Sequence, residues 1–465
     1  MLPGILGTFV PLSMDKNSQN VYELENAKIS SLLWKYFWPA FTGVVINSLY
    51  NVVDRIFIGQ GVGSIALSGL SAVYPIMLIL MAFGMLIGLG AGVRISINLG
   101  KKDFKRAEWV LGNSFILMLI VSAIITILGF AIKDPLLQLF GVSVDTKDIA
   151  NEYLNIILYG AVFNVVGFSL NNLIRSEGNA KIAMYSMLIS AGTNIILDPI
   201  FIFLLDMGVA GAAYATIISQ LILCIWVIKH FRSNRSVIRL SATNFKLNPQ
   251  IIWYIISIGF APFSMQIAGS FVQGLYNVQL IKFSNDVAIA AMGVINSVAM
   301  LIVMTIVAIN MAAQPIFGFS HGAKHFDRVK ETLKICMVAA TGIAVFGWIM
   351  VQIFPETMVL AFNSTDKELL EVGAKGLQTF LIALPVVGFQ IIVGNYFQSI
   401  GKAGVSALLT LMRQVILLIP ILFILPNYLG LDGVWFAGPI SDVGSAMIAG
   451  IFIIREFRKL NHQIA

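Results

Sequence analysis

Twelve apolar runs, each about as long as a membrane-spanning helix, constrain the fold of this 465-residue chain more than any other feature. A helix rises 1.5 Å per residue, so about 20 apolar residues cross the hydrocarbon core of a bilayer. Only 11% of the residues are charged, whereas a soluble chain of this length would carry about a quarter. We therefore expect an all-α polytopic membrane protein. Its predicted transmembrane helices are 36–58, 67–94, 109–131, 153–173, 182–204, 209–229, 252–281, 288–318, 332–354, 376–399, 405–425 and 433–454.

Basic residues gather on one side of these predicted helices. If the N-terminus is cytoplasmic, the segments "GKKDFKRA", "KHFRSNRSVIRL" and "AKHFDRVKETLK" all face the cytoplasm. Lys and Arg concentrate in cytoplasmic loops, so both termini are predicted to be cytoplasmic in a multi-pass protein of the cell membrane. The formal charge of +7 follows from these loops, and we expect a lipid bilayer and no nucleic acid as partner. A start of translation at Met14, where a polar segment opens, stays open beside a start at Met1.

The chain also repeats itself at an offset of 222 or 223 residues. Each half holds six predicted helices, an even number, so both halves insert the same way round and form a parallel repeat typical of transporters. The matching pairs are "NLGKKDFKRA" at 98–107 with "SHGAKHFDRV" at 320–329, "RSEGNA" at 175–180 with "QSIGKA" at 398–403, and "DMGVAGAAYA" at 206–215 with "YLGLDGVWFA" at 428–437. The predicted domains are an N-terminal tail at 1–29, an N-lobe at 30–236 with helices 1–6, a linker at 237–250, a C-lobe at 251–459 with helices 7–12, and a C-terminal tail at 460–465.

Charged residues inside the predicted helices are few, and each is a candidate for function because a charge in hydrocarbon is costly. They are Asp54, Arg55, Arg94, Asp198, Arg413 and Asp442. Arg55 and Arg94 lie near helix ends, where long basic side chains reach the headgroups. Arg413 and Asp442 lie at similar depth in the last two helices. They form either a structural ion pair or a charged lining of the second lobe.

Asp54 and Asp198 have no evident cationic partner in the sequence. Counted from the cytoplasmic side, Asp54 lies ~27 Å and Asp198 ~23 Å along their helices, so the two share a level. Asn194 precedes Asp198 by one turn on the same helix face, and Asn47 shares a face with Asp54. Thr216, on the descending sixth helix, reaches a similar level. Oxygen atoms from three helices are therefore expected to converge in the first half.

Such a cluster suits a small cation. Two acids in one pocket repel each other, and a proton or a hard cation relieves the repulsion. Carboxylate, amide and hydroxyl oxygens also suit Na⁺ as they suit other hard cations, so Asp54, Asn194, Asp198 and Thr216 are the candidate site for H⁺ or Na⁺. The alternative is a hydrogen-bonded Asp–Asn pair that braces the helices. The second half carries no acid at the equivalent positions, which fall near Asn277, Ile419 and Gly438.

Three stretches, "LYNVVDRIFIGQGVGSIALSGLS", "GTNIILDPIFIF" and "MGVAGAAYATIISQ", resemble the MATE family of multidrug and toxic compound extrusion transporters. The resemblance is closest to its DinF-like and MepA-like branch and covers about residues 25–459. It implies a V-shaped fold of two pseudo-symmetric six-helix bundles and a monomer. It places the first-lobe cation site on Asp54, Asn194, Asp198 and Thr216, with supporting polar positions at Asn47, Tyr153 and Asn171. Tyr153 and Asn171 are eighteen residues apart, five turns of one continuous helix.

The resemblance further implies a cation-coupled antiporter that exports organic, cationic lipophilic compounds, with H⁺ or Na⁺ as the coupling ion and no other cofactor. Pro39 and Pro199 remove backbone donors and are predicted to let helices 1 and 5 bend. A lipid or polysaccharide-precursor flippase is the alternative, although it would need several Arg or Lys inside the cavity. No enzyme is expected, because HExxH is absent and the four His lie in predicted loops or tails: His230, His321, His325 and His462.

Overall fold

The computed structural model describes residues 16–140, 142, 146–283, 286–362 and 367–464. Within these ranges the regular structure is helical and holds no strand, so the predicted all-α class is confirmed. The question of a start at Met14 concerns residues outside the described part of the chain.

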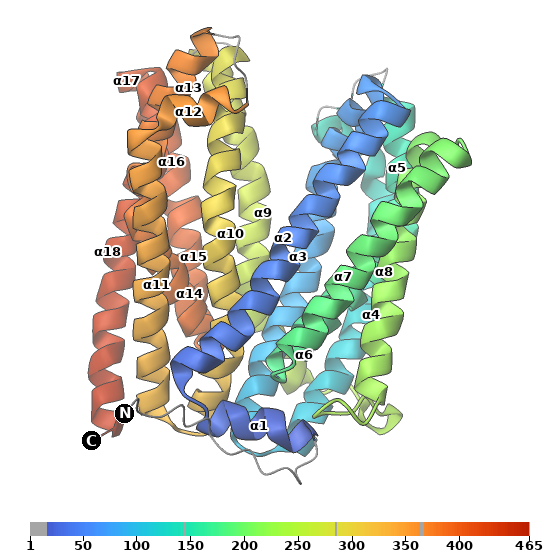
Figure 1. The fold of residues 1–465 in the computed structure, drawn as a ribbon, viewed down its shortest axis with the longest axis vertical. Coiled ribbons are helices and arrows are strands. Elements are labelled where there is room, and N and C mark those ends of the chain that lie inside the picture. Colours follow the sequence, from blue (N-terminus) through green and yellow to red (C-terminus); the bar gives the residue numbers. More distant parts are fainter. Residues whose placement is uncertain (1–15, 141, 143–145, 284–285, 363–366, 465) are drawn as a thin grey trace, which may run out of the picture. The chain divides into compact units, whose positions relative to one another are not determined.

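The helices of the first half run from blue to green in Figure 1. They are α1 (Lys16–Asn26), α2 (Ile29–Gly61), α3 (Ser64–Gly100), α4 (Phe104–Leu139), α5 (Lys147–Tyr159), α6 (Ala161–Ser176), α7 (Ala180–Pro199), the π-helical turn η1 (Ile200–Leu204) and α8 (Gly208–Arg232). The short η2 (Ala242–Asn244) lies in the linker. The second half holds α9 (Pro249–Phe283), α10 (Asp286–Gly322), α11 (Phe326–Ile353), α12 (Pro355–Leu360), α13 (Lys367–Phe380), α14 (Leu384–Ser399), α15 (Ala403–Leu411), the π-helical η3 (Met412–Leu417), α16 (Leu418–Ile424), α17 (Pro426–Leu429) and α18 (Leu431–Ile464).

Nine helical stretches of the described residues are long and apolar enough to cross a membrane, and two bent pairs bring the number to 11. The bent pairs are α5 with α6, at 54°, and α13 with α14, at 49°. The twelfth predicted span, 36–58, lies in the 33-residue α2. It is not among the 11, because polar residues such as Asn47 and Asp54 lower its hydropathy.

The two bends correct the prediction of straight helices at 153–173 and 376–399. The first bend follows Gly160, where an added Cβ would lie 2.4 Å from Ile217 Cγ1, so α8 packs tightly against the chain at the bend. The second precedes Pro385, which stands in the first turn of α14. Proline fits a first helical turn and disfavours helix in the residue before it.

The chain divides into two compact units. The first holds the chain up to Ile256 together with Ala312–Val329, and the second holds Ser257–Met311 and the chain from Lys330 onward. In the first unit α3 packs against α4 and α6, and α7 packs against α2 and α8. In the second, α18 packs against α13, α14 and α16. The lobe boundaries given above stay a prediction.

The repeat appears inside the first unit as a reciprocal contact between the ends of α3 and α10. A Cβ on Gly100 would lie 2.0 Å from Phe319 O, and a Cβ on Gly322 would lie 2.1 Å from Ile97 O. Gly100 and Gly322 are 222 residues apart, the repeat offset, and so are their contact partners Ile97 and Phe319. Only glycine lets two helix backbones approach so closely.

The predicted N-terminal tail contains a docked helix. Arg328 Nη2 donates hydrogen bonds to Leu24 O at 3.0 Å and Ala27 O at 2.9 Å, at the end of α1. Leu24 is buried, and Asn20 Nδ2 donates to Asn179 Oδ1 at 2.7 Å. The end of α1 is therefore fixed to the first unit by polar and apolar contacts.

Candidate cation site in the first unit

Four helices of the first unit bring five of the predicted polar side chains into one cluster. They are Asp54 on α2, Tyr153 on α5, Asn194 and Asp198 on α7, and Thr216 on α8. All five are buried, and Asp198 is 0% exposed. Burial of two carboxyl groups is costly unless something compensates for it.

The members of the cluster contact one another. Asn194 Nδ2 lies 3.4 Å from Asp198 Oδ1 and 3.5 Å from Thr216 Oγ1. The carboxyl groups of Asp54 and Asp198 lie within hydrogen-bonding reach of each other. The two Asn194 contacts are longer than the usual N–H···O distance of about 2.9–3.0 Å, so this amide holds its neighbours weakly.

Three oxygen atoms of the cluster are buried and have no hydrogen-bond partner among the described residues. They are Asp54 Oδ1, Asn194 Oδ1 and Asp198 Oδ2. A buried acceptor without a partner costs about 1–3 kcal/mol, and more if it is charged. A proton shared between the acids, or a hard cation bound by these oxygens, would remove that cost.

Among the described residues, no basic side chain forms an ion pair with either acid. None of the salt bridges among the described residues includes Asp54 or Asp198. Arg55, the next residue in sequence, is exposed and stacks over the Tyr74 ring, with Cζ 5.0 Å from its centroid. The described residues also hold no group of three or more His, Cys, Asp or Glu side chains with metal-binding geometry. The donors are therefore mixed oxygens, the set that suits H⁺ or Na⁺.

The backbone beside the site is irregular. Asp198 is followed by Pro199, the last residue of α7, and the chain continues as the π-helical turn η1. Proline has no N–H to give to the preceding turn, and single π-helical turns occur often at functional sites. Pro39 differs, because α2 continues through it as one helix. The bending role predicted for both prolines stays a prediction.

Of the other two predicted supporting residues, Asn171 bonds to residues distant from the cluster, and the role of Asn47 stays a prediction. Asn47 is on the exposed surface of α2. Asn171 donates to Ala183 O at 2.8 Å and Ser186 Oγ at 2.6 Å. Ala183 lies about 22 Å before Asp198 along α7. The one-face argument for Tyr153 and Asn171 does not hold, because the 54° bend at Gly160 separates α5 from α6.

A buried arginine, which the sequence did not predict, lies at this distant position. Arg175 is 6% exposed, and its guanidinium donates to Asn172 Oδ1 and Asn171 Oδ1, both at 3.1 Å. The "RSEGNA" repeat contained this residue, but its predicted place at a helix end gave no reason to expect burial.

A second missed group surrounds Glu177, which is 0% exposed. Its carboxylate lies 2.6 Å from His230 Nε2 and accepts hydrogen bonds from Asn179 Nδ2 at 2.7 Å, Ser236 Oγ at 2.7 Å and Val237 N at 3.1 Å. The expectation that His230 lies in a loop was wrong, because it is buried in the last turn of α8. These contacts tie the linker to α6 and α8.

The second unit contains a paired acid instead. Arg413 Nε lies 2.5 Å from Asp442 Oδ1, and Ser441 Oγ donates to Arg413 O at 2.6 Å. Gly438, the counterpart of Thr216, packs against the Tyr276 hydroxyl, which an added Cβ would approach to 3.3 Å. The carboxylate of Asp442 is thus paired with a guanidinium of the same unit.

Comparison with known proteins gives consistent results. A family model described as MatE matches residues 39–200 and 262–424. The multidrug export protein MepA of Staphylococcus aureus is 28% identical over 435 residues, 94% of this chain and 96% of that protein. MepA of Staphylococcus haemolyticus is 27% identical over 440 residues, 95% of this chain and 96% of that protein. A solved structure of a multidrug resistance MATE family transporter in an outward-facing conformation superimposes with a TM-score of 0.89 at 24% identity, covering 95% of this chain and 98% of that one.

Proposed function

The chain belongs to the MatE family, and from that premise we propose that it is an antiporter coupled to H⁺, Na⁺ or both that exports organic, cationic lipophilic compounds by alternating access. The relatives named multidrug export proteins support a small-molecule substrate. The proposed location is the cell membrane, with both termini in the cytoplasm.

The observation that carries the proposal is the buried pair Asp54 and Asp198 with its unpartnered oxygens. A coupling ion drives transport only if it binds the two end states with different affinity. Asp54 and Asp198 belong to different helices, α2 and α7, so a shift of one helix against the other changes the separation of the carboxyl groups. Ion affinity and helix position are then linked.

Two other readings are less well supported. A bracing Asp–Asn pair would satisfy its own oxygens, whereas here Asn194 Oδ1 and two carboxylate oxygens lack partners among the described residues. A flippase for a lipid-linked pyrophosphate would need Arg or Lys available inside the protein. Arg175, which is buried, and Arg413, which is partly exposed, are already bonded to other side chains.

The test is transport of a fluorescent organic cation in proteoliposomes, with a proton gradient and a sodium gradient applied separately. Asp54→Asn and Asp198→Asn remove one charge each at nearly constant volume, and both are expected to abolish ion-driven transport while the protein remains folded. Asp148→Asn is the matched control, because Asp148 is an exposed acid of the same unit. Full ion-driven transport by both Asp54→Asn and Asp198→Asn would refute the proposal.

A further inference from the structure

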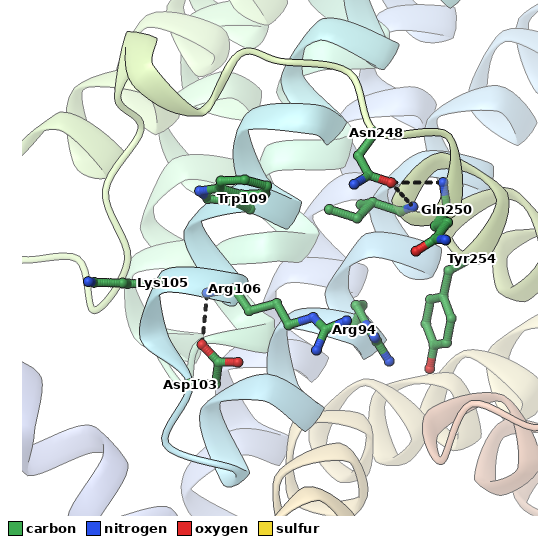
Figure 2. A pocket seen from close by; sticks show the side chains of 9 residues that line it. Arg94, Asp103, Lys105, Arg106, Trp109, Asn248, Gln250 and Tyr254 are labelled. Atoms are coloured by element: carbon green, nitrogen blue, oxygen red, sulfur yellow. Dashed lines mark hydrogen bonds between the residues drawn. The ribbon is translucent and has the colours of Figure 1, made fainter.

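The first unit contains a basic pocket far from the acidic cluster, at the end of the unit where the basic loops gather. It has a volume of about 580 Å³ and lies between the end of α3, the start of α4 and the start of α9 (Figure 2). This volume is within the range of about 300–1,000 Å³ usual for small-ligand sites.

The charge of the pocket is positive. Three basic side chains line it, Arg94, Lys105 and Arg106, against one acid, Asp103. Asp103 is already used as the cap of α4, where its Oδ1 accepts a hydrogen bond from Arg106 N at 3.0 Å. None of the three basic residues takes part in a salt bridge within the described ranges. The N-terminal ends of α4 and α9 add positive potential.

The walls of the pocket are aromatic and fixed. Arg94 Cζ lies 4.2 Å from the centroid of the Tyr254 ring, which orients the guanidinium. Asn248 caps α9 by accepting from Gln250 N at 2.9 Å, and its own N donates to Asn113 Oδ1 at 2.6 Å. Asn248, the linker residue that forms one wall of the pocket, is therefore fixed to α4 in the absence of a ligand, which lowers the ordering cost of binding.

Exposed aromatic residues mark the level of this pocket as a membrane interface. Trp109, in its wall, is 49% exposed, Trp253 beside Tyr254 is 72% exposed and Phe104 is 40% exposed. Tryptophan and tyrosine concentrate where headgroups meet the hydrocarbon core. A ligand with a phosphate at this level and acyl chains in the hydrocarbon core fits the pocket better than one that is wholly soluble.

We propose that this pocket binds the phosphodiester headgroup of an anionic glycerophospholipid, with the phosphate between Arg94 and Arg106. Guanidinium groups bind phosphate through two parallel hydrogen bonds. Basic pockets between transmembrane helices on the cytoplasmic side are a known setting for such headgroups. The site is separate from the proposed coupling site and does not depend on it.

Native mass spectrometry of the full chain, titrated with phosphatidylglycerol or with phosphatidylcholine of the same acyl chains, tests this proposal. The unaltered protein is expected to bind phosphatidylglycerol at least tenfold more tightly, a difference of about 1.4 kcal/mol. Arg94→Gln with Arg106→Gln is expected to lose this preference. Arg455→Gln with Arg458→Gln is the matched control, because it removes the same charge from two exposed arginines of α18, and it is expected to keep the preference.

Three results would overturn the proposal. The pocket variant could keep the full preference, the control variant could lose it equally, or glycerol 3-phosphate could displace the lipid at equal concentration, which would indicate a site for soluble phosphate. If the pocket variant does not fold, Lys105→Gln with Arg106→Gln replaces it, since both side chains are exposed on α4. That variant is also expected to lose the preference, and an undiminished preference would refute the site.

Discussion

The crossing of α3 and α10 predicts a large effect from adding one methyl group. In Gly322→Ala the new Cβ would lie 2.1 Å from Ile97 O, whereas real Cβ contacts essentially never fall below 3.0 Å. Both partners are backbone, so the two helix ends must separate rather than a side chain rotate. Overpacking of this kind costs about 1–3 kcal/mol, and the upper part of that range is expected here because no flexible group can yield.

Gly293→Ala is the matched control for this substitution. Gly293 lies on the same helix, α10, and an added Cβ there meets nothing within 4 Å. Alanine in place of a helical glycine should stabilise the chain by about 0.5–1 kcal/mol. The apparent melting midpoint in detergent, followed by intrinsic fluorescence, is therefore expected to fall for Gly322→Ala and to stay or rise for Gly293→Ala.

The reciprocal geometry supplies a second check. Gly100→Ala should cost about as much as Gly322→Ala, because its Cβ would lie 2.0 Å from Phe319 O. The double variant should cost less than the sum, since one substitution already separates the helices and neighbouring sites are not additive. Equal melting midpoints for Gly322→Ala and Gly293→Ala would show that the close approach is absent and would refute the reasoning.

Three further predictions concern the polar groups. Asp442→Asn should destabilise the second unit, by up to about 3–5 kcal/mol, because it leaves the Arg413 guanidinium without its acid. Adding Arg413→Gln should restore part of that loss. Thermal melts of the two single variants and the double variant test this, and additive losses of stability would contradict the pairing. Glu177→Gln should loosen the linker at a cost of about 1–3 kcal/mol, because His230, Ser236 and Val237 lose their charged acceptor. Trypsin is expected to cleave this variant at Arg235 faster than it cleaves the control variant Glu152→Gln, which alters an exposed acid. Equal cleavage rates in the two variants would contradict the prediction. Asn171→Ala should lower the melting midpoint by removing a partner of Arg175 while leaving the ion dependence of transport unchanged, and an altered ion dependence would show that Asn171 acts on the cluster.

The sequence predicts the spans and the main acids well because both depend on local properties. Hydropathy over about 20 residues is local, and the constant rise of a helix is enough to bring Asp54 and Asp198 to one level. The bend after Gly160 has no local signal, and Gly160 meets Ile217, 57 positions away in the chain, whereas the bend before Pro385 does have one, the proline itself. Asn171 is distant from Tyr153 for a simpler reason, because eighteen residues of helix span about 27 Å whether or not the helix bends.

The buried groups near the linker were missed for a similar reason. Glu177 becomes buried only because His230 and Ser236, more than 50 residues later, fold back onto it. No periodicity in "RSEGNA" indicates this, and an acid at a predicted helix end is ordinarily solvated. The lobe boundaries and the residues of the coupling site stay predictions.

The Arg413–Asp442 pair bears on the energy available for each transport cycle. A guanidinium attached to the chain cannot leave, so Asp442 has no free ion to exchange, and under the proposed function the exchange falls to Asp54 and Asp198 of the first unit. If one monovalent ion enters for each monovalent drug cation that leaves, no net charge moves and the membrane voltage contributes nothing. If two enter, one net charge moves inward, and the voltage contributes about 2.3 kcal/mol per 100 mV. Under the proposed function, the response of drug accumulation to an imposed voltage therefore reports how many ions the candidate site accepts.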